Sequence, residues 1–242
     1  MTKHTILFLA ANPHGTDGRA LDREARAIQV ELERSGHRDR FELVTRWAAE
    51  PLDLLRELRK LRPTVVHFSG RGGHRAPSRH HADRTPGRDV VGEDHRDEEP
   101  RDGLFFEGPD GQARWVSPQA LKDTFGAAGS SVQVVVLDAC YSATQAEALL
   151  AHVDCVVSTR GTIRDDAARS FAIGFYGGLG ERESIAAAYA QGCAAIGLEG
   201  LPDADRPQLA VRDGVDAEQL VLAADPPASP PEAPPATSTH PQ

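Results

Sequence analysis

The sequence is poor in several features that mark whole classes of protein. Only three of its 242 residues are cysteines, and they are scattered with no C-x-x-C pair, so neither a disulfide framework nor a zinc site is expected. Acidic residues outnumber lysine and arginine, 36 to 27, which gives a formal net charge of −9. This acidity argues against nucleic acid or an anionic membrane surface as the partner.

Long apolar runs, secretion signals and phosphate loops are also lacking. No stretch of 18 apolar residues occurs, and the start M-T-K-H-T-I-L-F-L-A-A-N-P turns polar without a cleavage pattern, so we expect no membrane span and a cytoplasmic protein. Neither G-x-G-x-x-G nor a P-loop with its Lys and Ser/Thr is present, which disfavours nucleotide binding. We expect neither a cofactor nor a metal.

The sequence does contain apolar runs that alternate with amphipathic segments. We expect buried strands at 5–10, 64–69, 132–137 and 153–158, and an alternating strand nearer the sheet edge at 41–47. We expect helices at 21–32, 51–61, 117–125, 143–150, 167–177 and 185–196. The order strand, helix, strand, helix, strand predicts a parallel sheet with right-handed crossovers. Two β-hairpins are also expected, one around the turn 108–111 and one within 208–222.

Two segments are expected to lack a packed structure. Residues 74–102 are densely charged and nearly free of large apolar side chains, so burial cannot offset their ordering entropy and a disordered insert is predicted. The histidines of this insert fit no metal-ligand spacing. Residues 225–242 are rich in Pro, Ala and Ser, which is typical of an extended disordered tail. We therefore expect one domain, residues 1–224, followed by this tail.

The strongest functional signal is the stretch S-V-Q-V-V-V-L-D-A-C-Y-S-A at 131–143. Its apolar run ends at Asp138, and Cys140 lies two residues on, so continued strand geometry would place both side chains on one face. The helix expected next would bring its positive end near the Cys140 thiol, which lowers a thiol pKa. Cys140 is therefore the candidate reactive residue, whereas Cys155 and Cys193 lie in apolar surroundings that suit core residues.

Five stretches, in order, resemble the CHAT-type caspase-like peptidases, which belong to the clan of caspases, metacaspases, legumains and separases. They are I-L-F-L-A-A-N-P, V-V-H-F-S-G-R-G-G, D-G-L-F-F-E, V-V-V-L-D-A-C-Y-S-A and D-D-A-A-R-S-F-A-I-G-F-Y-G-G-L, within residues 4–197. The resemblance implies an α/β fold, a caspase-like three-layer sandwich with a mostly parallel central sheet flanked by helices. It also implies a cysteine endopeptidase in a bacterial-type regulatory or defence cascade, with a peptide or protein substrate and an upstream activator protein.

The resemblance further implies roles for individual residues. Cys140 matches the nucleophile, and its own N–H and that of Gly72 match the donors that stabilise the oxyanion. Asp138 matches an acidic residue that receives an Arg or Lys side chain before the scissile bond. Asp165 or Asp166 adds to that pocket, or else serves the amino terminus of a helix.

The chain departs from the family pattern where the catalytic histidine is expected. The family's G-H-G reads Gly70-Arg71-Gly72 here, and a guanidinium cannot accept the thiol proton and pass it to the leaving amine. His67 lies four residues back, about 13 Å along a strand, whereas His74, three residues on, is an alternative base. Three functions stay open: an endopeptidase with impaired hydrolysis, a pseudo-peptidase that binds peptides or proteins, and a flavodoxin-like small-molecule domain, for which the phosphate loop is lacking.

Overall fold

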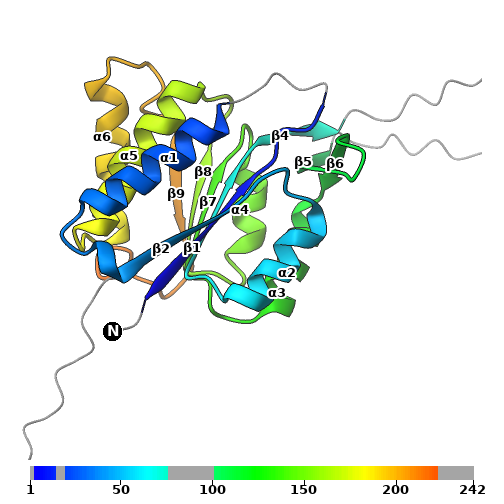
Figure 1. Ribbon diagram of the computed structural model, residues 1–242, viewed down its shortest axis with the longest axis horizontal. Helices are drawn as coiled ribbons and strands as arrows, with labels where there is room; N and C mark the ends of the chain where they lie inside the picture. The colour runs from blue at the N-terminus through cyan, green and yellow to red at the C-terminus, as the bar shows by residue number, and fades with distance from the viewer. Residues whose placement is uncertain (1–2, 15–19, 76–100, 223–242) are drawn as a thin grey trace, which may run out of the picture.

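The fold is built around a six-stranded sheet. Its strands are β1 (His4–Ala10), β2 (Phe41–Arg46), β3 (Val65–Ser69), β7 (Val134–Asp138), β8 (Cys155–Thr159) and β9 (Pro207–Val211). In the computed structural model, which describes residues 3–14, 20–75 and 101–222, their order is β2-β1-β3-β7-β8-β9 (Figure 1). All neighbours from β2 to β8 pair in parallel, and β9 runs antiparallel to β8. The predicted mostly parallel sheet is confirmed.

Helices cover both faces of this sheet. Within the described residues they are α1 (Leu21–Arg34), α2 (Pro51–Leu61), α3 (Pro118–Ala128), α4 (Ala143–Leu149), α5 (Asp165–Gly180), α6 (Ile185–Leu198) and the short 3-10 helix η1 (Arg38–Arg40). Figure 1 shows α1, α5 and α6 on one face and α2, α3 and α4 on the other. This is the three-layer sandwich predicted from the sequence. In the part of the chain that the structure describes, each helix is too short or too polar to cross a membrane.

The two hydrophobic cores explain why the strands appear in the sequence as uninterrupted apolar runs. On β1, Ile6 and Phe8 enter the core shared with α1, α5 and α6, while Leu7 and Leu9 enter the core shared with α2, α3 and α4. All four side chains are at most 1% exposed. A strand between two helical layers has no face left for polar alternation, so its sequence pattern is continuous rather than period two.

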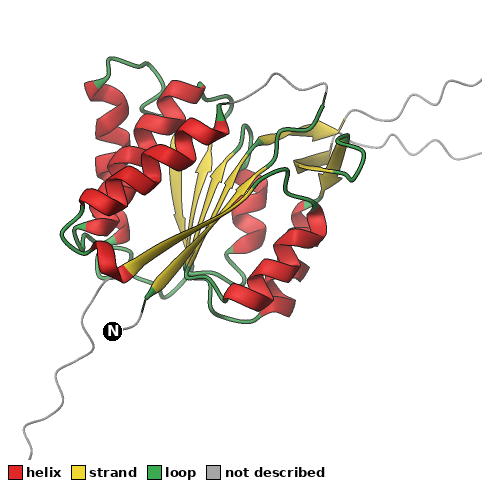
Figure 2. Ribbon diagram, in the orientation of Figure 1, coloured by secondary structure: helices red, strands yellow, loops and turns green. Residues whose placement is uncertain are grey.

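A second, smaller sheet follows β3. It consists of β4 (Arg71–Arg75), β5 (Arg101–Glu107) and β6 (Ala113–Val116), all antiparallel, and Figure 2 shows it beside the carboxyl end of the large sheet. The β5–β6 hairpin confirms the turn predicted at 108–111. The disordered insert predicted at 74–102 is too long at both ends, because His74 pairs with Asp102 and Gly73 with Gly103. Residues 76–100 of that insert lie outside the described residues.

The insert boundaries were misplaced for a physical reason. Backbone hydrogen bonds hold β4 to β5, and such bonds form between any residues that present an N–H and a C=O. A search for apolar burial does not detect polar strand residues such as His74 and Asp102, whose backbones the structure pairs in this ladder.

The hairpin predicted within 208–222 is wrong. β9 pairs with β8 instead, and residues 219–222 form no strand. The carbonyl of Leu220 accepts from the Ile185 N–H at 2.9 Å, and that of Ala217 accepts from the Ala186 N–H at 3.1 Å. These donors belong to the first turn of α6, where intrahelical acceptors are lacking. The segment therefore serves the helix terminus. The predicted tail, 225–242, lies outside the described residues.

Helix α2 offers a matched test of the core. Leu58 is 1% exposed in the core against β1, whereas Leu52 on the same helix is 59% exposed. Leu58→Ala should lower the free energy of unfolding by about 2–5 kcal/mol, because it removes buried methyl groups and leaves a cavity. Leu52→Ala should change it by less than about 0.5 kcal/mol. Urea unfolding measures both, and equal effects would contradict the assigned orientation of α2.

Candidate active site

The candidate site lies where β3 and β7 end side by side. Their parallel register places Ser69 directly opposite Asp138. The next N–H, that of Gly70, donates to the Asp138 carbonyl at 3.1 Å. Both chains therefore leave the sheet at the same level, at the carboxyl edge where α/β proteins commonly hold their ligands. The predicted residues Arg71 and Cys140 follow directly from these two strand ends.

The backbone of β4 touches the Cys140 turn at Gly72. A Cβ at Gly72 would lie 2.2 Å from the Cys140 carbonyl oxygen and 3.3 Å from the Ala139 Cβ. No real Cβ tolerates the first distance, so glycine is required here by close approach rather than by a turn. The structure thus brings together Gly72 and Cys140, two of the residues singled out in the sequence.

The turn that carries Cys140 differs from the prediction. β7 ends at Asp138, so the strand geometry on which the expected shared face depended does not continue to Cys140. The chain instead turns through Tyr141, whose φ is +56° and whose N–H donates to the Gly161 carbonyl at 2.8 Å. A tyrosine with positive φ is uncommon, and such conformations persist only where surrounding contacts hold them.

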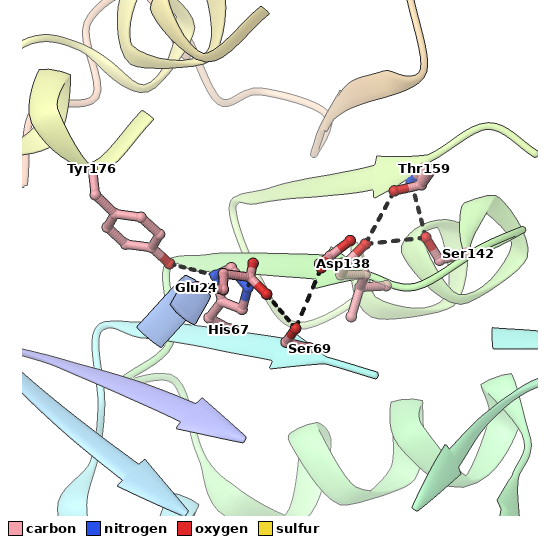
Figure 3. Close-up of polar contacts among 8 residues, drawn as sticks. Glu24, His67, Ser69, Asp138, Ser142, Thr159 and Tyr176 are labelled. Carbon is pink, nitrogen blue, oxygen red and sulfur yellow. Dashed lines mark hydrogen bonds and ion pairs between the residues drawn. The ribbon is translucent and has the colours of Figure 1, made fainter. Parts of the chain in front are cut away.

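Ser142 and Thr159 fix the far side of this turn. The Thr159 N–H donates to the Ser142 Oγ at 2.9 Å, and the Ser142 N–H donates to the Thr159 carbonyl at 3.2 Å. Both hydroxyls also lie within hydrogen-bond distance of the Leu137 carbonyl, at 3.4 and 3.5 Å (Figure 3). The Cys140 turn is therefore tied to the ends of β7 and β8.

Arg71, at the position of the family's histidine, and His74, the alternative base, both belong to β4. Arg71 is half-buried and its backbone is opposite Phe105 in the β4–β5 ladder. The backbone of His74, the alternative base, is three residues further along β4 and opposite Asp102. Asp102 in turn accepts a hydrogen bond from the Thr144 hydroxyl at 2.7 Å, which connects the small sheet to α4.

A buried polar chain leads from α5 to Asp138, and most of it was missed in the sequence. His67 Nδ1 lies 3.0 Å from the Tyr176 hydroxyl, and His67 Nε2 lies 3.0 Å from Glu24 Oε1. The Ser69 hydroxyl forms a short hydrogen bond to Glu24 Oε2 and lies 3.3 Å from Asp138 Oδ2 (Figure 3). Sequence analysis considered His67 only as a base, whereas the structure holds it in this chain.

Two features of the sequence could have revealed this buried polar chain. His67 and Ser69 are polar residues two apart in a strand that is otherwise apolar, so both must face the same buried environment and meet polar partners there. Glu24 lies on the buried stripe of α1, beside Ala25 and between the turns of Leu21 and Ile28. A charged residue on such a stripe is almost never buried without a partner.

The buried polar chain from Tyr176 to Asp138 borders a small cavity on the α1 and α5 side of the sheet. Its lining includes the carboxylates of Glu24 and Asp138, together with His67, Thr159, Ile163 and Phe171. The other acidic candidates lie in the first turn of α5, where Asp166 is 3.4 Å from Arg164 and the Ala167 N–H donates to its carboxylate at 2.9 Å. These contacts of Asp166 are those of a helix terminus, and Asp165 is the first residue of the same helix. Among the described residues, no group of three or more His, Cys, Asp or Glu side chains could hold a metal ion.

The three thiols have different surroundings. Cys155 is fully buried, and this burial, with the charge of Asp154, raises its pKa to about 11. Burial also raises the pKa of Cys193, although Tyr189 opposes the rise by a hydrogen bond. Cys140 and Cys193 are both half-buried, and Cys140 lies in the turn after β7.

Cys140 should be the most reactive thiol. At pH 8 a thiol with a pKa near 11 is about 0.1% thiolate, the form that reacts, so Cys155 should label at least tenfold more slowly than Cys140. Iodoacetamide labelling, followed by peptide mass spectrometry, measures all three rates in one sample. Equal rates, or faster labelling of Cys193, would remove the experimental case for Cys140.

Gly72→Ala should disturb the Cys140 turn, and Gly73→Ala supplies the matched control. A Cβ at Gly73 meets only Phe105, at 3.7 Å, which is ordinary contact. We expect Gly72→Ala to lower the free energy of unfolding by about 1–3 kcal/mol and to shift the amide resonances of Cys140 and Tyr141. Gly73→Ala should do neither, and similar spectra for the two variants would show that β4 does not press on the turn.

Comparison with known proteins agrees with this geometry. The family model described as CHAT domain matches residues 9–196, which is more than half of the 242-residue chain. That range includes β3, β4, the Cys140 turn and α5. A search of curated proteins finds no match. On the strength of the family match and of the sandwich fold that presents Cys140 at its sheet edge, the chain belongs to the CHAT domain family.

Proposed function

We propose that this CHAT domain is a cysteine endopeptidase that cleaves after Arg or Lys, with turnover limited by Arg71. The observation that supports it most is the close contact of Gly72 with the Cys140 turn. A Cβ added at Gly72 would lie only 2.2 Å from the Cys140 carbonyl oxygen. This contact brings the strand that carries the family's histidine position against the residue that matches the nucleophile. Asp138, at the end of β7 two residues before Cys140, supplies the negative charge for a basic side chain.

The proposed reaction begins with the Cys140 thiolate. Its sulfur attacks the scissile carbonyl carbon, the C=O electron pair moves to oxygen, and the N–H groups of Cys140 and Gly72 donate to that oxyanion. Collapse of the tetrahedral intermediate expels the amine, which must gain a proton, and leaves a thioester. Water then attacks the thioester, releases the new carboxyl group and returns the thiol.

Arg71 divides these steps into those that the site favours and those that it does not. A guanidinium near the thiol stabilises the thiolate, because it is always positively charged. A guanidinium has no acceptor lone pair and does not give up its protons in proteins, so it neither takes up the thiol proton nor delivers one to the amine. Those transfers fall to water, which removes the contribution of general acid–base catalysis, typically about 10²–10⁴ in rate.

The same observations favour a second function, a pseudo-peptidase that binds a basic peptide or protein without cleaving it. Arg71 is the specific observation for it, since binding requires Asp138 but no proton transfer. In both functions we propose a cytoplasmic domain that engages a peptide or protein with a basic residue and responds to an upstream activator protein.

Arg71→His should restore the missing base. We expect cleavage of a fluorogenic Arg peptide to rise by about 10²–10⁴, since an imidazole has a pKa near the assay pH. The double variant Arg71→His with Cys140→Ala should be silent, which controls for contaminating proteases. Arg114→His, on exposed β6, makes the same charge change away from the site and should leave the rate unchanged.

The outcomes of this assay separate the alternatives. If the parent protein already cleaves well and Arg71→His changes nothing, Arg71 does not occupy the base position and His74 becomes the next residue to replace. If neither form cleaves but both bind the Arg peptide, the pseudo-peptidase is the function. If neither form cleaves nor binds it, the preference for a basic residue is wrong.

A further inference from the structure

Gln145 is a buried polar residue that the proposed reaction does not use. It lies in the first turn of α4 and is 0% exposed. An amide removed from water in this way costs free energy unless it is hydrogen-bonded. The partners of Gln145 therefore show which parts of the fold it holds together.

The side-chain amide of Gln145 connects two separate segments. Its Nε2 donates to the carbonyls of Tyr141 at 3.3 Å and Ser142 at 3.1 Å, and its Oε1 accepts from the Gly103 N–H at 3.0 Å. Only this orientation of the amide pairs donors with acceptors, because carbonyls face one end of the group and an N–H faces the other. Tyr141 and Ser142 belong to the turn that follows Cys140, whereas Gly103 belongs to β5.

Each of these segments leads to a candidate oxyanion donor. Tyr141 is the next residue after Cys140. In the β4–β5 ladder, Gly103 is opposite Gly73, the neighbour of Gly72. Gln145 is thus bonded both to the turn that carries one donor and to the small sheet that carries the other.

The bond to Tyr141 also holds an uncommon backbone conformation. Tyr141 has a φ of +56°, its N–H donates to the Gly161 carbonyl at 2.8 Å, and its own carbonyl accepts from Gln145. A residue other than glycine keeps such a conformation only where surrounding contacts impose it. Loss of the Gln145 amide removes one of these contacts, and the Cys140 N–H on the same turn can then change direction.

Gly72 and Gln145 limit the separation of the turn and the small sheet in opposite directions. A Cβ at Gly72 would strike the Cys140 carbonyl, so steric contact sets how closely β4 can approach. The hydrogen bonds of Gln145 set how far the two can move apart, because they weaken steeply with distance. The preceding residue, Thr144, adds a bond from α4 to the small sheet, donated by its hydroxyl to Asp102 at 2.7 Å.

We propose that Gln145 is a positioning residue that fixes the relative position of the two oxyanion donors, the N–H groups of Cys140 and Gly72. The inference rests on the proposed function, in which those groups stabilise the oxyanion. Such donors act when they lie about 2.7–3.1 Å from the position that the oxyanion will occupy. Gln145 acts through its three hydrogen-bond partners and not on the reacting atoms.

The test compares two small electrophiles on Cys140. p-Nitrophenyl acetate is attacked at its carbonyl carbon, so the C=O electron pair moves to oxygen before p-nitrophenolate leaves and the thiol is acetylated. Iodoacetamide is attacked at its CH2 carbon and loses iodide, with no oxyanion. Both reactions need the thiolate, and neither needs a general acid or a basic side chain. The ratio of the two rate constants therefore reports oxyanion stabilisation, independent of Arg71.

The absorbance of p-nitrophenolate measures acylation, and peptide mass spectrometry measures alkylation. The Cys140→Ala protein gives the acylation of other residues, which is subtracted. N-acetylcysteine gives the ratio for a thiol without oxyanion donors.

Three variants separate positioning from stability. Gln145→Met nearly keeps the length of the side chain and loses its hydrogen bonds. Gln145→Asn keeps the amide but is one methylene shorter, so it cannot reach both segments, and it tests the link even where Gln145→Met fails to fold. Leu149→Ala removes a core side chain of the same helix that is 1% exposed, and it supplies the destabilised control.

We expect the ratio for the unsubstituted protein to exceed that of N-acetylcysteine by about 10²-fold, the scale of one oxyanion donor. Gln145→Met should lower the ratio by about tenfold or more, because a displaced donor loses much of its effect, and Gln145→Asn should lower it as well. Leu149→Ala should lower the urea midpoint of unfolding and leave the ratio unchanged.

Three outcomes are decisive. A lower ratio in every Gln145 variant that folds, with Leu149→Ala unchanged, supports the inference. An unchanged ratio in a folded Gln145 variant, or an equal loss in Leu149→Ala, overturns the role of Gln145 and leaves the oxyanion donors standing. A ratio for the unsubstituted protein equal to that of N-acetylcysteine overturns the donors in the proposed function and, with them, the role of Gln145.

Discussion

The parallel pairing of β3 with β7 is the constraint on which the candidate site depends. It sets Ser69 opposite Asp138 and lets the Gly70 N–H reach the Asp138 carbonyl at 3.1 Å. Because both strands end at this level, the next residues of each chain must share the same space. β4 therefore passes so close to the Cys140 turn that Gly72 has no room for a side chain. A slip of one residue in this register would turn every side chain of β7 to the opposite face.

Much of the scaffold was predictable from the sequence, because strands buried on both faces are continuous apolar runs and the helices between them are amphipathic. The strand that leads to Cys140 and the capping of α3 by Ser117, whose hydroxyl accepts from the Ala120 N–H at 3.1 Å, follow from local pattern. The turn through Tyr141 does not, since a positive φ at tyrosine is imposed by contacts with a distant segment, Gly161. Nor do the buried contacts of Glu24, whose partners His67 and Ser69 lie 43 and 45 positions along the chain.

The two groups of candidate residues belong to different parts of the fold. Asp138, Ser69 and Glu24 form a buried polar chain on the α1 and α5 side of the sheet, whereas Arg71 and Gly72 belong to the small sheet beside it. In the proposed function, a substitution at position 71 would change proton transfer and leave the buried polar chain in place. This separation is the physical basis for proposing an impaired peptidase and a pseudo-peptidase together, since the two proposals differ only in proton transfer.

The central claim is that Cys140 and Asp138 belong to one peptide-binding site. The most direct measurement is the reaction of the unsubstituted protein with a peptidyl acyloxymethyl ketone that ends in arginine, compared with the same probe ending in norleucine. This alkylation requires a thiolate and a bound side chain but no general acid for an amine leaving group. The account predicts a single adduct on Cys140, formed at least about tenfold faster with the arginine probe. Equal rates for the two probes, or an adduct on Cys193, would contradict it.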